Sequence, residues 1–181
     1  MKHDVVDVTV CLIAKNKKYN FMNINAEIDI KYMNEALLEA KKAYEKQEIP
    51  VGAVIVYNDE IIARAHNCRM EEKNVFTHAE VKAINEACKA LDSWVLEDAT
   101  LYVTLEPCMM CAGAILQSRI KRIVYATIEP KHGVVESIDK VLDNPKLNHH
   151  VEITSGVLQE ESSTLLKNFF HELRQNKKHM I

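Results

Sequence analysis

Four side chains have the types and spacing of a metal centre that carries out hydrolysis. His78 and Glu80 lie two residues apart, and Cys108 follows a proline and lies three residues before Cys111. One imidazole and two thiolates are typical Zn²⁺ ligands, and three protein ligands leave a fourth position for water. Zinc lowers the pKa of that water from about 15.7 towards about 7, and a nearby carboxylate such as Glu80 can move its protons.

Each half of this pattern also has a simpler interpretation. A single C-x-x-C pair is typical of redox pairs and of structural zinc sites as well. Thr77 and Glu80 have the spacing of a capping box, in which the carboxylate would bind only a backbone N–H. A structural site needs a fourth ligand, and Cys88 is excluded because ten helical residues span roughly 15 Å. Cys68 and His132 remain as alternatives.

The complete combination is more specific than its halves. H-x-E followed by P-C-x-x-C is the signature of zinc-dependent nucleobase deaminases, and this chain has all of it. The sequence therefore predicts a zinc-dependent hydrolase that removes an exocyclic amine as ammonia. His78, Cys108 and Cys111 would bind the metal, and Glu80 would act as the proton shuttle.

Alternating strands and helices must bring these segments together. If the segment with His78 and the segment with Cys108 and Cys111 each begin a helix on one face of a sheet, the imidazole can meet both thiolates near the positive ends of the helices. Such alternation predicts a layered α/β sheet. The apolar spacing indicates helices over residues 32–44, 78–91, 109–118 and 158–174, and strands over residues 51–57, 61–65, 101–105 and 123–126.

Length and composition indicate one globular domain, which we place at residues 26–181. Hydrophobic residues make up 48% and charged residues 27% of the 181 residues. Five cysteines in a chain of this length do not indicate a disulfide framework, so a reducing cytoplasm is expected. The formal net charge of −3 is not that of a polyanion-binding protein, so any basic surface must be local.

The first 25 residues fit the scheme poorly and are expected to form an amino-terminal appendage. Its apolar run, residues 5–14, is interpreted as an extra strand, and residues 8–14 are too few to span a membrane. Met22 offers an alternative translation start. The first 21 residues are therefore expected to be dispensable for folding and activity.

A resemblance to one enzyme family runs from about residue 32 to residue 177. Besides the zinc signature, it includes Asn67 and the long block ATLYVTLEPCMMCAGA at residues 99–114. The other similar segments are residues 49–56, 118–120, 148–149 and 169–170. In these features the chain resembles the bacterial tRNA-specific adenosine deaminases, the TadA family.

The resemblance implies a three-layer α/β/α sandwich with a central five-stranded mixed sheet, of the cytidine deaminase-like kind. It implies hydrolytic conversion of the wobble adenosine of an arginine tRNA anticodon to inosine. In that mechanism zinc-bound hydroxide attacks the base while Glu80 shuttles protons. A homodimer with one Zn²⁺ per subunit, binding the tRNA anticodon arm in the cytoplasm, is also implied.

The resemblance further assigns residues around the substrate. Asn67 is expected to contact the flipped base or its ribose. Three features depart from the family pattern: Glu129 stands where bacterial members commonly have aspartate, residues 74–77 lack a frequent proline, and the amino-terminal appendage has no counterpart in the family. The other expected substrate-binding residues are Ile49, Pro50, Val51, Leu105, Glu106, Glu129, Asn148, Phe169 and Phe170.

Two other functions stay open at this point. One is deamination of a free base or nucleotide such as cytosine, guanine or deoxycytidylate. The other is a non-catalytic, zinc-stabilised RNA-binding module in which Glu80 is only a helix cap. An RNA substrate would also require cations for its phosphates. The candidates are Arg119, Lys121, Arg122, Lys131, Lys146, Arg174, Lys177 and Lys178.

Overall fold

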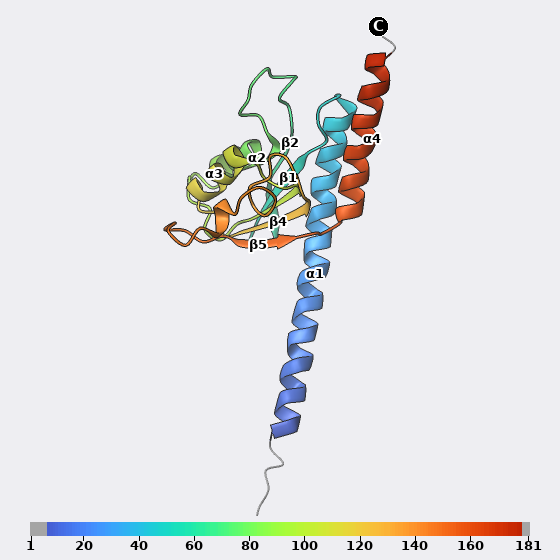
Figure 1. The fold of residues 1–181 in the computed structure, drawn as a ribbon. Helices are drawn as coiled ribbons and strands as arrows, with labels where there is room; N and C mark the ends of the chain where they lie inside the picture. The colour runs from blue at the N-terminus through green and yellow to red at the C-terminus, as the bar shows by residue number, and fades with distance from the viewer. Residues whose placement is uncertain (1–6, 179–181) are drawn as a thin grey trace, which may run out of the picture.

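A five-stranded mixed sheet separates two layers of helices (Figure 1). The computed structural model describes the backbone of residues 7–178 and the side chains of residues 25–176. The elements, in chain order, are α1 (Asp7–Glu45), β1 (Gly52–Tyr57), β2 (Glu60–His66), α2 (Ala79–Ala90), β3 (Thr100–Leu105), α3 (Met109–Gln117), β4 (Arg122–Thr127), a 3-10 turn (Val141–Asp143), β5 (Glu152–Ser155) and α4 (Gln159–Lys178).

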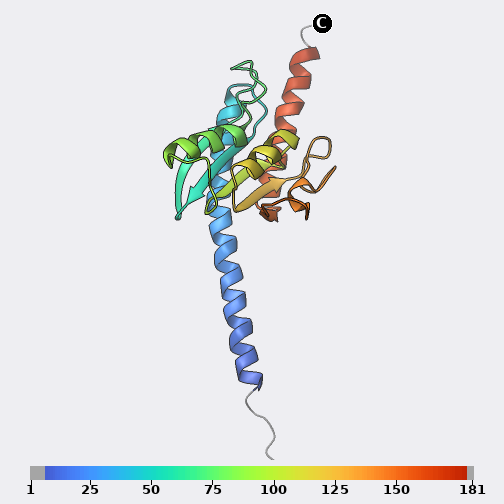
Figure 2. The same cartoon turned by 90° about the vertical axis from the view of Figure 1, so that its left-hand side faces the viewer.

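The strands lie in the order β2-β1-β3-β4-β5. β1 is antiparallel to both of its neighbours, whereas β3, β4 and β5 are parallel. α2 and α3 cover one face of the sheet, and α1 and α4 cover the other (Figures 1 and 2). The three-layer sandwich with a five-stranded mixed sheet is thereby confirmed.

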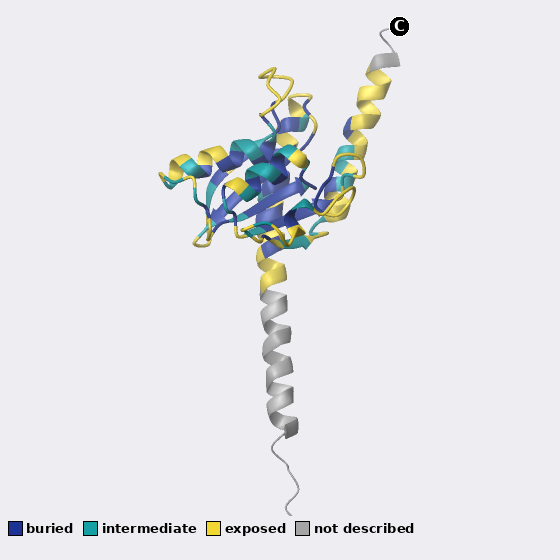
Figure 3. Ribbon diagram, turned by 60° about the vertical axis from the view of Figure 1, so that its left-hand side comes forward, coloured by how far each residue is buried: buried dark blue, intermediate teal, exposed yellow. Residues whose placement is uncertain are grey.

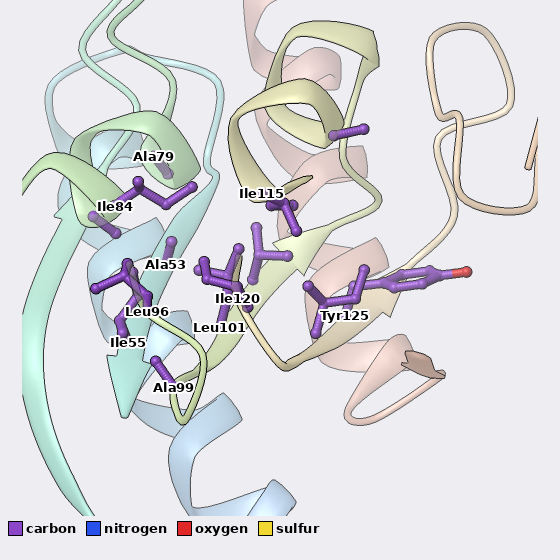
Figure 4. Packing of buried hydrophobic residues seen from close by; sticks show 14 of the residues in the cluster. Ala53, Ile55, Ala79, Ile84, Leu96, Ala99, Leu101, Ile115, Ile120 and Tyr125 are labelled. Carbon is purple, nitrogen blue, oxygen red and sulfur yellow. The ribbon is translucent and has the colours of Figure 1, made fainter. Parts of the chain in front are cut away.

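Alternation along the strands produces a hydrophobic core on each face of the sheet, as expected for side chains that point in opposite directions. In β1, Ala53 and Ile55 face α2 and α3, where they join the larger core (Figure 4). Val54 and Val56 belong to the second core, together with Met33 from α1. The central strands are buried in Figure 3, whereas the outer helix faces are exposed.

Helix α1 lies unusually close to the beginning of β1. A Cβ atom added to Gly52 would lie 2.1 Å from the carbonyl oxygen of Ala36 and 2.3 Å from the backbone nitrogen of Ala40. Glycine is therefore required for this approach. The contact fixes the turn between α1 and β1, which carries Ile49 and Val51.

Two differences from the predicted elements have physical causes. Residues 7–14, part of the expected extra strand, belong instead to α1, because a continuous apolar run does not distinguish a strand from a helix. Residues 5–6 lie outside the described residues. The pattern did not indicate β5, which has only four residues and pairs with β4 alone. That residues 1–21 are dispensable stays a prediction.

Among the residues that the structure describes, no helix has the length and apolar composition to cross a membrane.

A buried ion pair connects α1 to the sheet. Asp29 is 4% exposed and accepts hydrogen bonds from both terminal nitrogens of Arg122, at 2.8 and 2.7 Å. The Tyr102 hydroxyl donates a third hydrogen bond to Asp29, at 3.0 Å. The proposal of Arg122 as a phosphate-binding cation is therefore wrong, because its guanidinium group is used inside the fold.

We predict that Arg122→Met lowers the free energy of unfolding by about 3–5 kcal/mol, because it leaves the Asp29 carboxylate buried without its cation. Urea unfolding followed by circular dichroism measures this loss. Lys121→Met removes the neighbouring exposed cation and serves as the control, for which little change is expected. Equal stability of both variants would contradict the prediction.

Candidate metal centre and base pocket

The metal-ligand candidates meet where two helices begin at one edge of the sheet. His78 is the residue before the first turn of α2, and Cys108 holds the same position in α3. Cys111 lies in the first turn of α3, so its sulfur is on the same side as that of Cys108. The exposed N–H groups and positive dipole ends of both helices favour thiolates here.

The three donor atoms have the mutual distances that a tetrahedral zinc ion requires. Zn–S bonds of about 2.3 Å and Zn–N bonds of about 2.0–2.1 Å imply S···S near about 3.8 Å and S···N near about 3.6 Å. The two sulfurs are 3.6 Å apart. His78 Nδ1 lies 3.7 Å from Cys108 Sγ and 3.5 Å from Cys111 Sγ. The donor set therefore fits zinc.

The ligand group consists of three residues and not four. Within the described part of the chain, no further histidine, cysteine, aspartate or glutamate joins His78, Cys108 and Cys111 in this group. Cys68 and His132, the remaining candidates for a fourth ligand, are therefore outside it. A site with three protein ligands is typical of catalytic zinc, whereas structural sites usually have four.

The electrostatics of the cluster favour a bound cation. A hydrogen bond from Cys111, followed by one from His78, lowers the pKa of the Cys108 thiol to about 3. Sharing its proton with Cys108 and burial both raise the pKa of Cys111. A second thiolate beside the first thus requires compensating positive charge, which a divalent metal supplies.

Glu80 lies beside this cluster and is only 4% exposed. Burial raises the pKa of its carboxyl group, which favours a proton acceptor that can also return the proton. The capping-box interpretation is wrong. α2 is preceded by His78, not Thr77, and the Thr77 N–H and hydroxyl both bond to the Asn74 carbonyl, at 3.4 and 2.8 Å.

A pocket of about 300 Å³ opens over the candidate metal ligands. Most of the predicted substrate residues are in its wall, namely Ile49, Val51, Asn67, Leu105, Glu106, Glu129 and Phe170. Pro50 is buried between two wall residues but does not line the pocket. Asn148 is exposed outside it, and Phe169 packs against Tyr44 of α1, with 5.6 Å between ring centroids.

The orientation of the Asn67 amide is set by a buried carboxylate. Glu48 is 1% exposed, and it accepts a hydrogen bond from Asn67 Nδ2 at 3.0 Å. Its other oxygen accepts the N–H groups of Met70 and Glu71, at 2.6 and 2.7 Å. Because a carboxylate only accepts, the amide nitrogen must face Glu48. The amide oxygen of Asn67 is then free to accept a hydrogen bond from a ligand in the pocket.

Four wall residues were not predicted as substrate contacts: Arg69, Ala79, His132 and Leu166. Arg69 follows Asn67 by two residues, and Ala79 follows His78 directly. Their closeness in sequence to predicted site residues is the signal that could have identified these two as wall residues. The segment without the frequent proline is ordered by Asn74, whose side-chain oxygen accepts the N–H of Phe76 at 3.0 Å.

The fold and the donor set define a class of protein, and comparison with known proteins agrees with it. A family model described as MafB19-like deaminase matches residues 27–174, so the chain is a deaminase by class. The tRNA-specific adenosine deaminase of Bacillus subtilis is 54% identical over 147 residues, which cover 81% of this chain and 91% of that protein. The enzyme of the same name from Aquifex aeolicus is 49% identical over 145 residues, covering 80% and 95%.

Solved structures show the same relationship. One from a study of A-to-I editing by tRNA:A34 deaminases at the wobble position is 43% identical, with a TM-score of 0.73, and the match covers 75% of this chain and 99% of that one. This chain belongs to the family of tRNA-specific adenosine deaminases. A guanine deaminase from Nitrosomonas europaea, 22% identical with a TM-score of 0.63, shares the fold; that match covers 76% and 81%.

We predict that the purified protein contains one zinc ion per chain and that Cys108→Ser loses most of it, because one thiolate ligand is removed. Elemental analysis by mass spectrometry measures the zinc content. Cys88→Ser alters a cysteine outside the ligand group and should retain the metal. A full zinc content in Cys108→Ser would show that this sulfur is not a ligand.

Proposed function

We propose that this chain hydrolyses the wobble adenosine of an arginine tRNA anticodon to inosine and releases ammonia. The observation that carries the proposal is the three-ligand metal centre beside buried Glu80 in an open pocket. The names of the relatives support the RNA substrate, since they describe tRNA-specific adenosine deaminases.

His78, Cys108 and Cys111 would hold zinc in the proposed reaction. When bound, zinc supplies Lewis-acid activation of water, which makes hydroxide available near neutral pH. Glu80 accepts the proton of the attacking water and returns it to the exocyclic amine as the C6–N6 bond breaks.

Asn67 and Phe170 would recognise the nucleotide in different ways. The Asn67 oxygen accepts a hydrogen bond from a donor group on the base or ribose, since its amide nitrogen is bound to Glu48. Phe170 is 38% exposed and offers an aromatic surface for a base to stack on. Both residues come to the pocket from different elements, one after β2 and one from α4.

The surroundings of the pocket favour a polynucleotide over a free base. The pocket adjoins a groove of about 650 Å³ between α4 and residues 127–132. The two cavities share six lining residues: Ile49, Leu105, Glu129, His132, Leu166 and Phe170. The groove also contains Lys131, Lys167 and Arg174, three cations that can neutralise phosphates. A free base would need no such extension, whereas flanking anticodon nucleotides would.

We predict that the zinc-loaded protein converts adenosine to inosine in an arginine tRNA anticodon stem-loop, because a loop base is extruded at little cost. Mass spectrometry of the digested RNA detects the product. Cytosine, guanine and deoxycytidylate are tested in parallel for ammonia release. Turnover of a free base or nucleotide without any inosine in the RNA would overturn the proposal in favour of that alternative.

Glu80→Gln is expected to lower kcat by about 10²–10⁴-fold, the usual contribution of a general acid–base group. Zinc content and thermal stability should stay near those of the wild type, because the amide has almost the same shape. Glu86→Gln, on the exposed side of the same helix, is the matched control. If Glu80→Gln retained full turnover, the carboxylate would have no part in proton transfer.

The homodimer that the resemblance implies stays a prediction, which the solution mass from sedimentation equilibrium would check.

A further inference from the structure

Glu106 is a buried carboxylate that lies two residues before a metal ligand. It is 2% exposed, and five donors from one loop converge on it. Oε1 accepts the N–H groups of Val135, Glu136 and Ser137, at 3.0, 2.8 and 3.0 Å. Oε2 accepts the N–H of Glu129 at 2.9 Å and the Ser137 hydroxyl.

These donors leave little capacity for a substrate. An ionised carboxylate has about four lone-pair sites, and five hydrogen bonds already use both oxygens. Glu106 therefore lines the pocket without an oxygen available for a further strong contact. Its partners indicate what it does instead, since all of them belong to residues 129–137.

The backbone of this loop is joined to the segment that contains Cys108. Gly133 forms a β-bridge with Cys108, and the Val134 N–H donates to the Pro107 carbonyl at 3.1 Å. A Cβ atom on Gly133 would lie 2.3 Å from the Glu106 carboxyl carbon and 2.3 Å from Oε2. A side chain at this position would therefore have to displace the Glu106 carboxylate from its hydrogen bonds.

The same loop forms walls of both cavities. Glu129 and His132 line the pocket over the metal ligands, and both also line the groove, together with Pro130 and Lys131. Residues 129–132 therefore form a ridge shared by the pocket and the groove. Release of the Glu129 N–H from Glu106 would let the first part of this ridge move.

We propose that Glu106 is a positioning residue that holds this ridge in place and thereby sets the binding of the nucleotides around the reactive base. The inference rests on the proposed function, because the ligand of the ridge is the RNA. Glu106 acts through Glu129 and His132 and does not touch the reacting atoms. Its loss should therefore weaken substrate binding more than it slows the chemical step.

Glu106→Gln tests this role with almost no change in volume. The amide oxygen can keep the three N–H groups of Val135, Glu136 and Ser137, but the amide nitrogen then faces the Glu129 N–H, and that hydrogen bond is lost. We expect KM for the stem-loop to rise about tenfold, the effect of one lost bond to a charged group, with kcat within about twofold and zinc unchanged. Asp139→Asn removes an exposed carboxylate just after the loop and should leave both constants unchanged.

A double-mutant cycle separates positioning from general damage to the fold. Gly133→Ala should reproduce the rise in KM, because the new methyl group collides with Glu106. In a Glu106→Ala background the same change should add little, since the collision partner is gone. Additive effects of the two changes would show that they act independently and would overturn the proposal.

Hydrogen exchange distinguishes failure of this inference from failure of the proposed function. Faster exchange of the Glu129 amide in Glu106→Gln, measured by mass spectrometry of peptides, supports the role of Glu106 in holding residues 129–132, whether or not the RNA is a substrate. Unchanged exchange there, an unchanged KM in an active enzyme, or a fall in kcat alone would each overturn it. Absence of inosine formation by the wild type would count against the proposed function only.

Discussion

The site depends on the balance of charge in a small buried volume. Two cysteine sulfurs lie 3.6 Å apart, and the carboxylate of Glu80 is buried beside them. Two helix ends supply partial positive charge but not enough for two thiolates and a carboxylate, so the arrangement calls for a divalent cation. The distances among the three donor atoms and the burial of Glu80 beside them are consistent with this need.

Two further buried carboxylates organise the loops around the centre. Glu48 accepts hydrogen bonds from the Asn67 side-chain amide and from the N–H groups of Met70 and Glu71, at the beginning of the loop between β2 and α2. Glu106 does the same for residues 129–137 on the other side of the pocket. Each carboxylate accepts several hydrogen bonds from loop N–H groups that have no partner in the sheet. These hydrogen bonds give loops without regular structure defined positions.

Residue spacing was sufficient to predict α2, α3, α4, the part of α1 from residue 32 onward and four of the strands, because periodicity is a local property. It also pointed to His78, Cys108 and Cys111, which the fold brings together as a group that could hold a metal. It was not sufficient for Glu106, whose partners lie 23–31 residues along the chain and are mostly backbone groups that carry no sequence signal. β5 was not predicted for a similar reason. Its four residues form a strand through pairing with β4, which is a tertiary contact and not a local pattern. The capping-box interpretation of Thr77 failed because Asn74 competes for the same groups.

The candidate metal ligands lie at helix beginnings backed by the core, whereas most of the pocket wall comes from connections at one edge of the sheet. Insertions or substitutions in those connections can therefore alter which molecule enters without disturbing the reactive centre.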